Sequence, residues 1–231
     1  MVVSTIPEFS GDSDGTTQEY AYSRLRNAII VGAFAPGTAL TIRGLAQELN
    51  LSPTPIREAV RRLSSENAIQ VLGNRRLKVP DMTLGRFEEL AQLRISLETH
   101  ATERAFPYIS NVFIEHMRAL DDQMDVVLAA GDLDALTRIN QSFHKDLYRL
   151  NPHQAVVPMI ESVWLQLGPF QRQAIKSIKT TAMVDRHKEM LAAMEARDVT
   201  ALCAALESDI RDGSILLGRA MLQSQTEGTV A

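Results

Sequence analysis

The stretch from Leu51 to Leu63, LSPTPIREAVRRL, constrains the fold of this chain more than any other. Ser52 is a favourable helix N-cap, because a serine hydroxyl can accept a hydrogen bond from an amide of the first turn. Pro53 and Pro55 would then occupy positions N1 and N3, where the missing amide hydrogen costs nothing and φ is already helical. The stretch therefore predicts a helix that begins at Pro53.

The two faces of this expected helix differ in chemistry. Apolar side chains recur at Ile56, Val60 and Leu63, which places them on one face of a helix. Polar and basic side chains lie on another face: Thr54, Arg57 and Arg61. A short helix whose basic, hydroxyl-bearing face is directed outward is typical of a recognition helix that enters a groove of DNA.

The flanking segments complete a winged helix-turn-helix. Upstream, apolar residues at helical spacing predict a second short helix, with Asn50 as a left-handed C-cap: Ile42, Leu45, Ala46 and Leu49. Downstream, apolar residues alternate on both sides of Gly73-Asn74 and predict a β-hairpin: Ile69, Val71, Leu77 and Val79. Three basic residues fall near its tip: Arg75, Arg76 and Lys78. The alternative is a small helical subdomain whose basic face is merely solvated.

Charge is distributed unevenly along the chain. The net charge is −4 overall, but residues 18–80 hold nine Lys or Arg against four Glu, and residues 81–231 carry an excess of acids. A basic segment joined to an acidic one indicates a polyanionic partner for the first alone. We therefore expect the partner to be double-stranded DNA, bound by residues 18–80.

The remainder of the chain has helical periodicity without strand-like alternation. Its breakers separate about six expected helices, with interruptions at Pro158 and at Gly168-Pro169. The predicted fold is mainly α: an N-terminal winged helix-turn-helix with a small β-hairpin wing, followed by an all-α helical bundle. The expected boundaries are a flexible tail over 1–17, a DNA-binding domain over 18–80, an all-helical effector-binding and dimerisation domain over 81–220, and a C-terminal tail over 221–231.

Two motifs carry a resemblance to a known family. The opening helix and Pro-Gly turn within Leu25–Leu40, and Leu45-Ala46 followed by Ser52–Ala59, are similar to the GntR-type transcription regulators. The similarity continues over residues 18–220 into a ligand domain of the FCD type. It implies a ligand-responsive, homodimeric transcription regulator that binds operator DNA and is not an enzyme.

The resemblance also implies a set of DNA contacts: Arg43, Ser52, Thr54, Arg57, Arg61, Arg75 and Arg76. Two positions depart from the family pattern. Pro53 stands where many relatives carry an arginine that reads bases, and Arg76 replaces the usual wing glycine. We therefore expect one direct base contact of the family to be missing.

Many FCD domains hold a divalent metal with an Asp and a His four residues apart and two further His on the last two helices. His144 and His187 match the second and third positions, whereas Asn140 replaces the Asp and Asp209 replaces the last His. The resemblance thus implies a site for Zn, Ni, Mn or Fe made by these four residues. The alternative is that His144 and His187 are core histidines beside an organic ligand.

Arg94 and Glu98 are four residues apart on the first bundle helix, which faces the ligand cavity in similar proteins. An arginine there suits recognition of a small carboxylate effector, because its guanidinium binds carboxylates through two hydrogen bonds. The alternative is a structural ion pair. Arg172 is a weaker candidate of the same kind.

Two other functions remain open: a metal-dependent hydrolase that uses His144 and His187, and an architectural DNA-binding protein whose bundle only dimerises. No HExxH motif, phosphate loop or nucleophile elbow supports an enzyme. No apolar run is long enough to cross a membrane, no secretory signal is evident, and the single cysteine, Cys203, fits a reducing compartment. We expect a cytoplasmic protein without a membrane partner.

Overall fold

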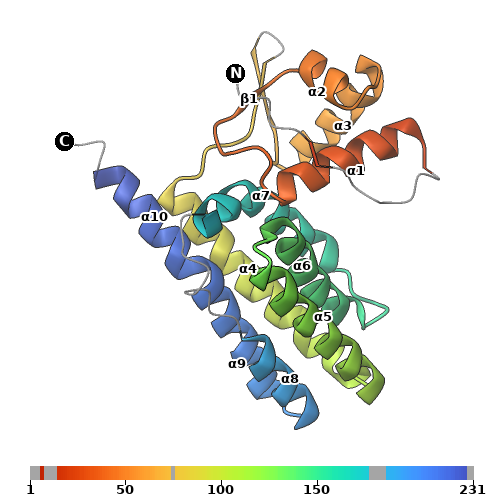
Figure 1. Cartoon of the computed structure of the whole chain (residues 1–231), viewed down its shortest axis with the longest axis vertical. Coiled ribbons are helices and arrows are strands. Elements are labelled where there is room, and N and C mark those ends of the chain that lie inside the picture. Colours follow the sequence, from red (N-terminus) through yellow and green to blue (C-terminus); the bar gives the residue numbers. More distant parts are fainter. Residues whose placement is uncertain (1–5, 8–14, 74–75, 177–185, 228–231) are drawn as a thin grey trace. The chain divides into compact units, whose positions relative to one another are not determined.

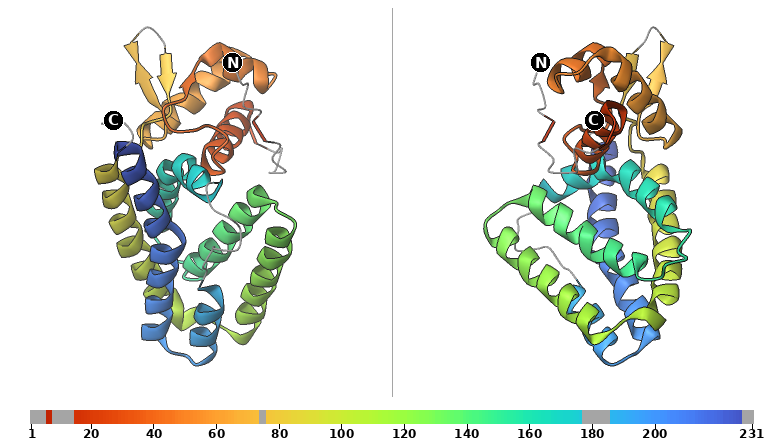
Figure 2. Two further views of the ribbon diagram at one scale, coloured as in Figure 1. Left: turned by 60° about the vertical axis from the view of Figure 1, so that its left-hand side comes forward. Right: turned by 90° about the vertical axis from the view of Figure 1, so that its right-hand side faces the viewer.

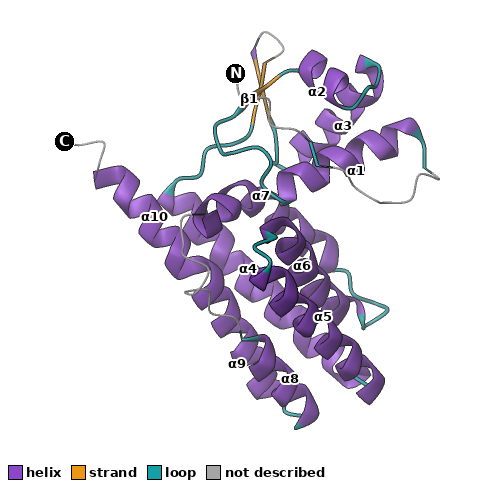
Figure 3. Ribbon diagram, in the orientation of Figure 1, coloured by secondary structure: helices purple, strands orange, loops and turns teal. Residues whose placement is uncertain are grey.

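The computed structural model describes residues 6–7, 15–73, 76–176 and 186–227. The chain divides into two compact units, Met1–Thr83 with Ser162–Gln173, and Leu84–Glu161 with Ala174–Ala231. Helices dominate the described residues, and the small sheet lies in the first unit (Figure 3). The predicted fold class, mainly α with a small wing, is confirmed.

The first unit is a helix-turn-helix flanked by one further helix and a small sheet (Figure 1). Its elements in chain order are α1 (Thr17–Ile30), β1 (Ala39–Leu40), α2 (Ile42–Glu48), α3 (Pro53–Ser65), β2 (Gln70–Leu72) and β3 (Arg76–Lys78). Both α1 and α2 pack against α3. The buried face of α3 is the predicted one: Ile56, Val60 and Leu63.

The turn between α2 and α3 follows the expected chemistry, with one exception. Asn50 has a φ of 52°, the left-handed conformation of a helix C-cap. Ser52 occupies the N-cap position of α3, but its side chain makes no capping hydrogen bond. A capping hydroxyl accepts from the amide of N2 or N3, and N3 is Pro55, which has none. The Ser52 hydroxyl is exposed instead.

The wing contains a strand that the sequence did not predict. The strand order is β1-β3-β2, and both pairings are antiparallel, with Val71 opposite Leu77. β1 is only two residues long, too short to have a recognisable period. Ile69, Leu77 and Val79 are buried, whereas Val71 is 58% exposed on the hairpin.

Tyr22 of α1 holds the end of the recognition helix. Its hydroxyl donates a hydrogen bond of 2.6 Å to Glu66, and the guanidinium of Arg62 lies 3.7 Å above its ring. Burial and the bond to Glu66 raise the pKa of Tyr22 to about 12, so the phenol remains a donor at neutral pH. These contacts join α1 to the C-terminal end of α3.

The middle of α7 (Val157–Lys176) belongs to the first unit and packs closely against the end of α1. A Cβ atom added to Gly168 would lie 2.5 Å from the carbonyl oxygen of Ile30. Gly32 has a φ of +69°, and a Cβ there would lie 2.2 Å from Arg172. A break of the helix at Gly168-Pro169, one of the two expected forms of interruption there, is wrong, because α7 continues through Pro169. The glycine instead permits close helix packing.

The second unit is a helical bundle (Figure 2). Its helices are α4 (Leu84–Ala105), α5 (Asn111–Ala129), α6 (Leu133–Arg149), α8 (His187–Glu195), α9 (Val199–Ile210) and α10 (Leu216–Glu227), with a 3₁₀ turn over Phe106–Tyr108 and a π-helical segment over Arg211–Ile215. α4 packs against α6, α9 and α10, and α5 packs against α6 and α8. The side chains of Ser110, Asp132 and Asp198 cap α5, α6 and α9.

The C-terminal helix differs from the prediction. Helical backbone continues through the π-helical segment and α10 to Glu227. Residues 221–227, which the sequence assigned to a tail, form the last turns of α10. No helix in the described part of the chain is both long and apolar enough to span a bilayer.

Candidate functional site

One face of the first unit forms a groove of about 1010 Å³ between α2, α3 and the wing. It is lined by Thr41, Ile42, Arg43, Pro53, Arg57, Val60, Arg61, Ser64, Val71 and Leu77. Three of the seven predicted DNA contacts are in this lining: Arg43, Arg57 and Arg61. A basic groove beside an exposed helix face has the chemistry required to bind a phosphate backbone.

The arginines of this face are not equally available. Arg43 and Arg57 are exposed and make no ion pair with any described residue. Arg61 instead binds Glu58 on the same helix, with Nη2 2.9 Å from Oε2. Arg57 therefore presents a full positive charge, whereas the charge of Arg61 is partly neutralised by its neighbour.

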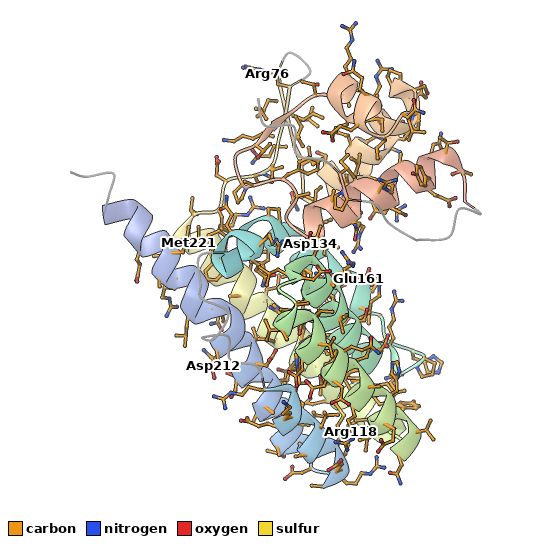
Figure 4. The ribbon with its side chains drawn as sticks, viewed as in Figure 1. Arg76, Arg118, Asp134, Glu161, Asp212 and Met221 are labelled. Atoms are coloured by element: carbon orange, nitrogen blue, oxygen red, sulfur yellow. The ribbon has the colours of Figure 1, made fainter. Side chains whose placement is uncertain are left out.

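The remaining predicted contacts lie around this groove. Ser52 and Thr54 are exposed at the start of α3. Arg76 is exposed at the start of β3 in the wing (Figure 4). Arg75 lies outside the described residues.

Three of the four predicted metal ligands come together in the core of the bundle. His144 of α6, His187 of α8 and Asp209 of α9 each offer one ligand atom, and these atoms lie within 4.8 Å of one another. All three residues are buried. The ring centroids of the two histidines are 5.4 Å apart, and the ring of Phe143 lies 4.4 Å from that of His187. The cluster is therefore closely packed and covered by an aromatic ring.

Local sequence explains why these polar groups are buried. His144 lies on the apolar face of α6 with Phe143, Leu147 and Tyr148. Asp209 follows Leu202, Ala205 and Leu206 on the buried face of α9. The helices are held by their apolar faces, so the polar groups are carried into the core. A buried polar group without a partner costs roughly 1–3 kcal/mol, so the cluster needs internal partners or a ligand.

Asp209 is ionised in this cluster. Its Oδ2 lies 3.3 Å from Nε2 of His144, and its Oδ1 accepts a hydrogen bond of 3.1 Å from the amide of Arg186. Burial alone would raise the pKa of Asp209, but His144, His187 and the Arg186 amide outweigh burial and hold this pKa well below its usual range. The buried Nε2 atom of His144 makes no well-aligned hydrogen bond.

A second chain of contacts reaches the other side of His144. Nε of Arg94 donates a bond of 2.6 Å to Oε1 of Glu98, and the hydroxyl of Tyr148 lies 2.6 Å from Oε2 of Glu98. The same hydroxyl lies 3.2 Å from Nδ1 of His144. Desolvation lowers the pKa of Arg94, but the charge and the hydrogen bond of Glu98, with Tyr148 and Asp209, together outweigh it and raise this pKa. Burial raises the pKa of Tyr148 well above its usual value. The ion pair that was one of the two alternatives for Arg94 and Glu98 is present.

Sequence reasoning missed Asp121 and Tyr148. Asp121 lies on α5 with Oδ1 3.5 Å from Nδ1 of His187, and it is 3% exposed. The sequence feature that could have identified Asp121 is its helical spacing, which places it on the same buried face of α5 as Ile114, Met117 and Met124. Tyr148 follows His144 by one helical turn, so spacing alone could have indicated their contact.

Arg186, directly before α8, contributes more than its amide. Its guanidinium binds Asp212 on the π-helical segment at 2.7 Å and Glu189 on α8 at 2.6 Å. It therefore joins the start of α8 to the end of α9 beside Asp209.

Two predicted residues are not part of the cluster as the structure has it. Asn140 is half-buried one turn before His144, and its side chain makes no hydrogen bond to any described residue. Arg172 lies on the part of α7 assigned to the first unit, where it contacts Gly32. Asn140 precedes His144 by one turn of the same helix and could join it in binding a ligand.

Known proteins resemble this chain in both units. The sequence profile of the bacterial regulatory proteins of the gntR family matches residues 17–79, and the profile of the FCD domain matches residues 89–212. The chain belongs to the GntR family and carries an FCD domain. This GntR-family protein is a transcription regulator, and regulators of this family bind operator DNA and effectors.

Individual relatives agree with this assignment. The HTH-type transcriptional regulator McbR of Escherichia coli is 27% identical over 177 residues, which cover 75% of this chain and 80% of McbR. The gluconate operon transcriptional repressor of Bacillus subtilis is 25% identical over 198 residues, covering 81% of this chain and 79% of the repressor. The solved structure of E. coli McbR/YncC has the same fold, with a TM-score of 0.82 over 92% of this chain and 99% of that chain at 24% identity.

Proposed function

We propose that this regulator senses a small carboxylate metabolite through a divalent metal held in its bundle. The observation that carries the proposal is the convergence of His144, His187 and Asp209 in the core of the FCD domain. A purely architectural bundle would have no use for such a cluster, since buried polar groups destabilise a core unless they are satisfied.

The donor set fits a divalent metal of the transition series. Two imidazoles and a carboxylate suit Zn, Ni, Mn or Fe better than a hard ion such as Mg. The ionised Asp209 faces the buried Nε2 atom of His144, which makes no well-aligned hydrogen bond. A cation between these groups would satisfy both. We include Asn140 as a fourth, neutral oxygen donor on the turn before His144.

When bound, the metal would supply an electrophilic centre for the carboxylate of the effector. Arg94 would act as a second anchor on α4, because a buried guanidinium is a strong partner for a carboxylate. The binding energy would alter the packing of the bundle and thereby the spacing of two DNA-binding domains.

We further propose that residues 18–80 form the DNA-binding domain and residues 81–220 the effector-binding and dimerisation domain. Arg43, Ser52, Thr54, Arg57, Arg61, Arg75 and Arg76 would contact the operator. Their support is the basic groove and the exposed side chains beside it. A regulator of this kind works where its operator DNA is, which for a bacterial protein is the cytoplasm.

The test is a thermal-shift screen of the full-length protein with Zn²⁺, Ni²⁺, Mn²⁺ and Fe²⁺, alone and with small carboxylic acids. A ligand at a hundredfold excess over its Kd stabilises the folded state by about 2.7 kcal/mol, so Tm should rise. The double variant His144→Ala/His187→Ala should lose this response, whereas His153→Ala, at an exposed histidine, should keep it. A response to acids without any response to metals would leave an organic-ligand sensor and reject the metal.

A further inference from the structure

The hydroxyl of Tyr148 has one hydrogen atom to donate, and both Glu98 and His144 lie within hydrogen-bond distance of it. Oε2 of Glu98 lies at 2.6 Å, and Nδ1 of His144 lies at 3.2 Å. Tyr148, Glu98 and His144 have no exposed surface, and both contacts are short enough to be direct. The direction of each hydrogen bond is therefore set by the groups themselves.

Glu98 determines where the hydrogen of Tyr148 goes. Its other oxygen, Oε1, accepts a hydrogen bond of 2.6 Å from Nε of Arg94 in a buried ion pair. A carboxylate accepts hydrogen bonds and donates none. Tyr148 therefore donates to Glu98 and presents an oxygen lone pair to His144, so that Nδ1 of His144 must carry the hydrogen.

The tautomer of His144 follows from this direction. A neutral imidazole carries its hydrogen on one nitrogen and a lone pair on the other. With the hydrogen on Nδ1, the lone pair is on Nε2, which faces Asp209 at 3.3 Å. A lone pair opposed to a carboxylate is repulsive, so a cation, either a proton or a metal ion, lies between Nε2 and Asp209.

We propose that the chain Arg94–Glu98–Tyr148 is a positioning device that fixes His144 in the Nδ1–H tautomer and so makes Nε2 its metal-binding atom. The proposal rests on the metal site proposed above. A hydrogen-bond acceptor behind a ligating histidine fixes its tautomer and orientation, and loss of such a partner typically lowers metal affinity 10- to 100-fold.

Glu98→Gln tests the direction of the hydrogen bonds that run through Glu98 and Tyr148 to His144, while it keeps the shape of the side chain. Arg94 would still donate to the side-chain oxygen, so the amide group would turn its hydrogens toward Tyr148. Tyr148 would then accept from the amide and donate to Nδ1 of His144. The hydrogen of the neutral imidazole would move to Nε2 and block the metal. We expect an affinity for Zn²⁺ at least about tenfold below that of the wild type.

Tyr148→Phe is the second variant, because Glu98→Gln also leaves a buried arginine without its carboxylate and could impair folding. It keeps the ring and removes only the hydroxyl, so Nδ1–H loses its acceptor. We again expect a loss of about tenfold or more. Thr102→Val is the matched control: it removes a buried hydroxyl one turn after Glu98 on α4, and that hydroxyl makes no hydrogen bond to a described residue.

The experiment is a competition titration of Zn²⁺ between a chromophoric chelator and each full-length protein. It is paired with ¹⁵N spectra of the imidazoles in the zinc-loaded wild type and thermal unfolding of the metal-free proteins. The wild type should show a protonated Nδ1 at His144, and Thr102→Val should bind as the wild type does. A variant that binds weakly although its metal-free Tm is unchanged supports positioning.

Two outcomes overturn the proposal, and they differ. The tautomer assignment alone would be rejected if the wild type binds Zn²⁺ saturably and Glu98→Gln and Tyr148→Phe bind it with equal affinity. It would also be rejected if the metal is bound by Nδ1 of His144. Absence of saturable binding by the wild type would reject the metal site and the tautomer assignment together.

Discussion

At the scale of single residues, two arginines on α3 differ in whether their positive charge is already paired with a carboxylate. Arg57 and Arg61 lie one turn apart on α3, and both are exposed. Arg61 is held by Glu58 at 2.9 Å, whereas Arg57 has no ion-pair partner among the described residues. An exposed ion pair contributes little to stability, but it does reduce the positive field that DNA meets at Arg61.

Arg57→Ala is expected to weaken operator binding by more than about 1 kcal/mol, the scale of one good base or phosphate contact. A gel-shift titration at fixed ionic strength measures this change. Arg138→Ala removes the same charge from an exposed position in the bundle and should leave affinity nearly unchanged. Equal affinities for the wild type and Arg57→Ala would remove Arg57 from the DNA contacts.

At the scale of elements, the contact of α7 with α1 explains a glycine that the sequence suggested was a helix breaker. Gly168 lies within a continuous helix, and its missing side chain allows the backbone of α1 to approach. The atom that a Cβ would meet at 2.5 Å is the carbonyl oxygen of Ile30, a backbone atom that cannot turn aside. Local propensity has been overridden by tertiary packing here.

Gly168→Ala should therefore destabilise the protein, by roughly 1–3 kcal/mol, the typical cost of overpacking a core. Urea unfolding measured by circular dichroism gives this difference. Gly85→Ala is the matched control, because Gly85 lies in the first turn of α4 with nothing within 4 Å of an added Cβ. That change should be neutral or stabilising by up to about 1 kcal/mol, since alanine is the better helix former. Equal destabilisation by both variants would contradict the packing explanation.

At the scale of the whole molecule, the uneven charge distribution indicates which part of the chain attracts DNA. Residues 18–80 carry an excess of basic residues, whereas the chain as a whole has a net charge of −4. The acidic remainder would be repelled by DNA, so attraction is confined to the winged helix-turn-helix. One such domain covers half of a palindromic operator, and twofold proteins match the symmetry of such sites.

We therefore expect the protein to be a homodimer in solution, with the bundle contributing to the interface. Light scattering coupled to size exclusion should give about twice the chain mass of 25.6 kDa at micromolar concentration. The same measurement with operator DNA should give two chains per duplex. A monomer mass under both conditions would refute the dimer.

The sequence alone was sufficient for the helices and the hairpin of the winged helix-turn-helix, but not for the short strand β1. Its signals are local. The prolines after Ser52 start α3, and Asn50, in the left-handed conformation, marks the end of α2. The periodicity of Ile56, Val60 and Leu63 identifies the buried face of α3. Each signal acts within a few residues of the feature it specifies, so it can be read without knowing the tertiary structure.

The bundle core was decided by tertiary structure. His144, His187 and Asp209 were candidates only through resemblance, and Asp121 and Tyr148 were not candidates at all. A polar residue on an apolar helix face has the same local pattern whether it faces a ligand, another polar residue or solvent. Only the packing of α4, α5, α6, α8 and α9 determines which of these groups meet, because those contacts join residues far apart in the chain.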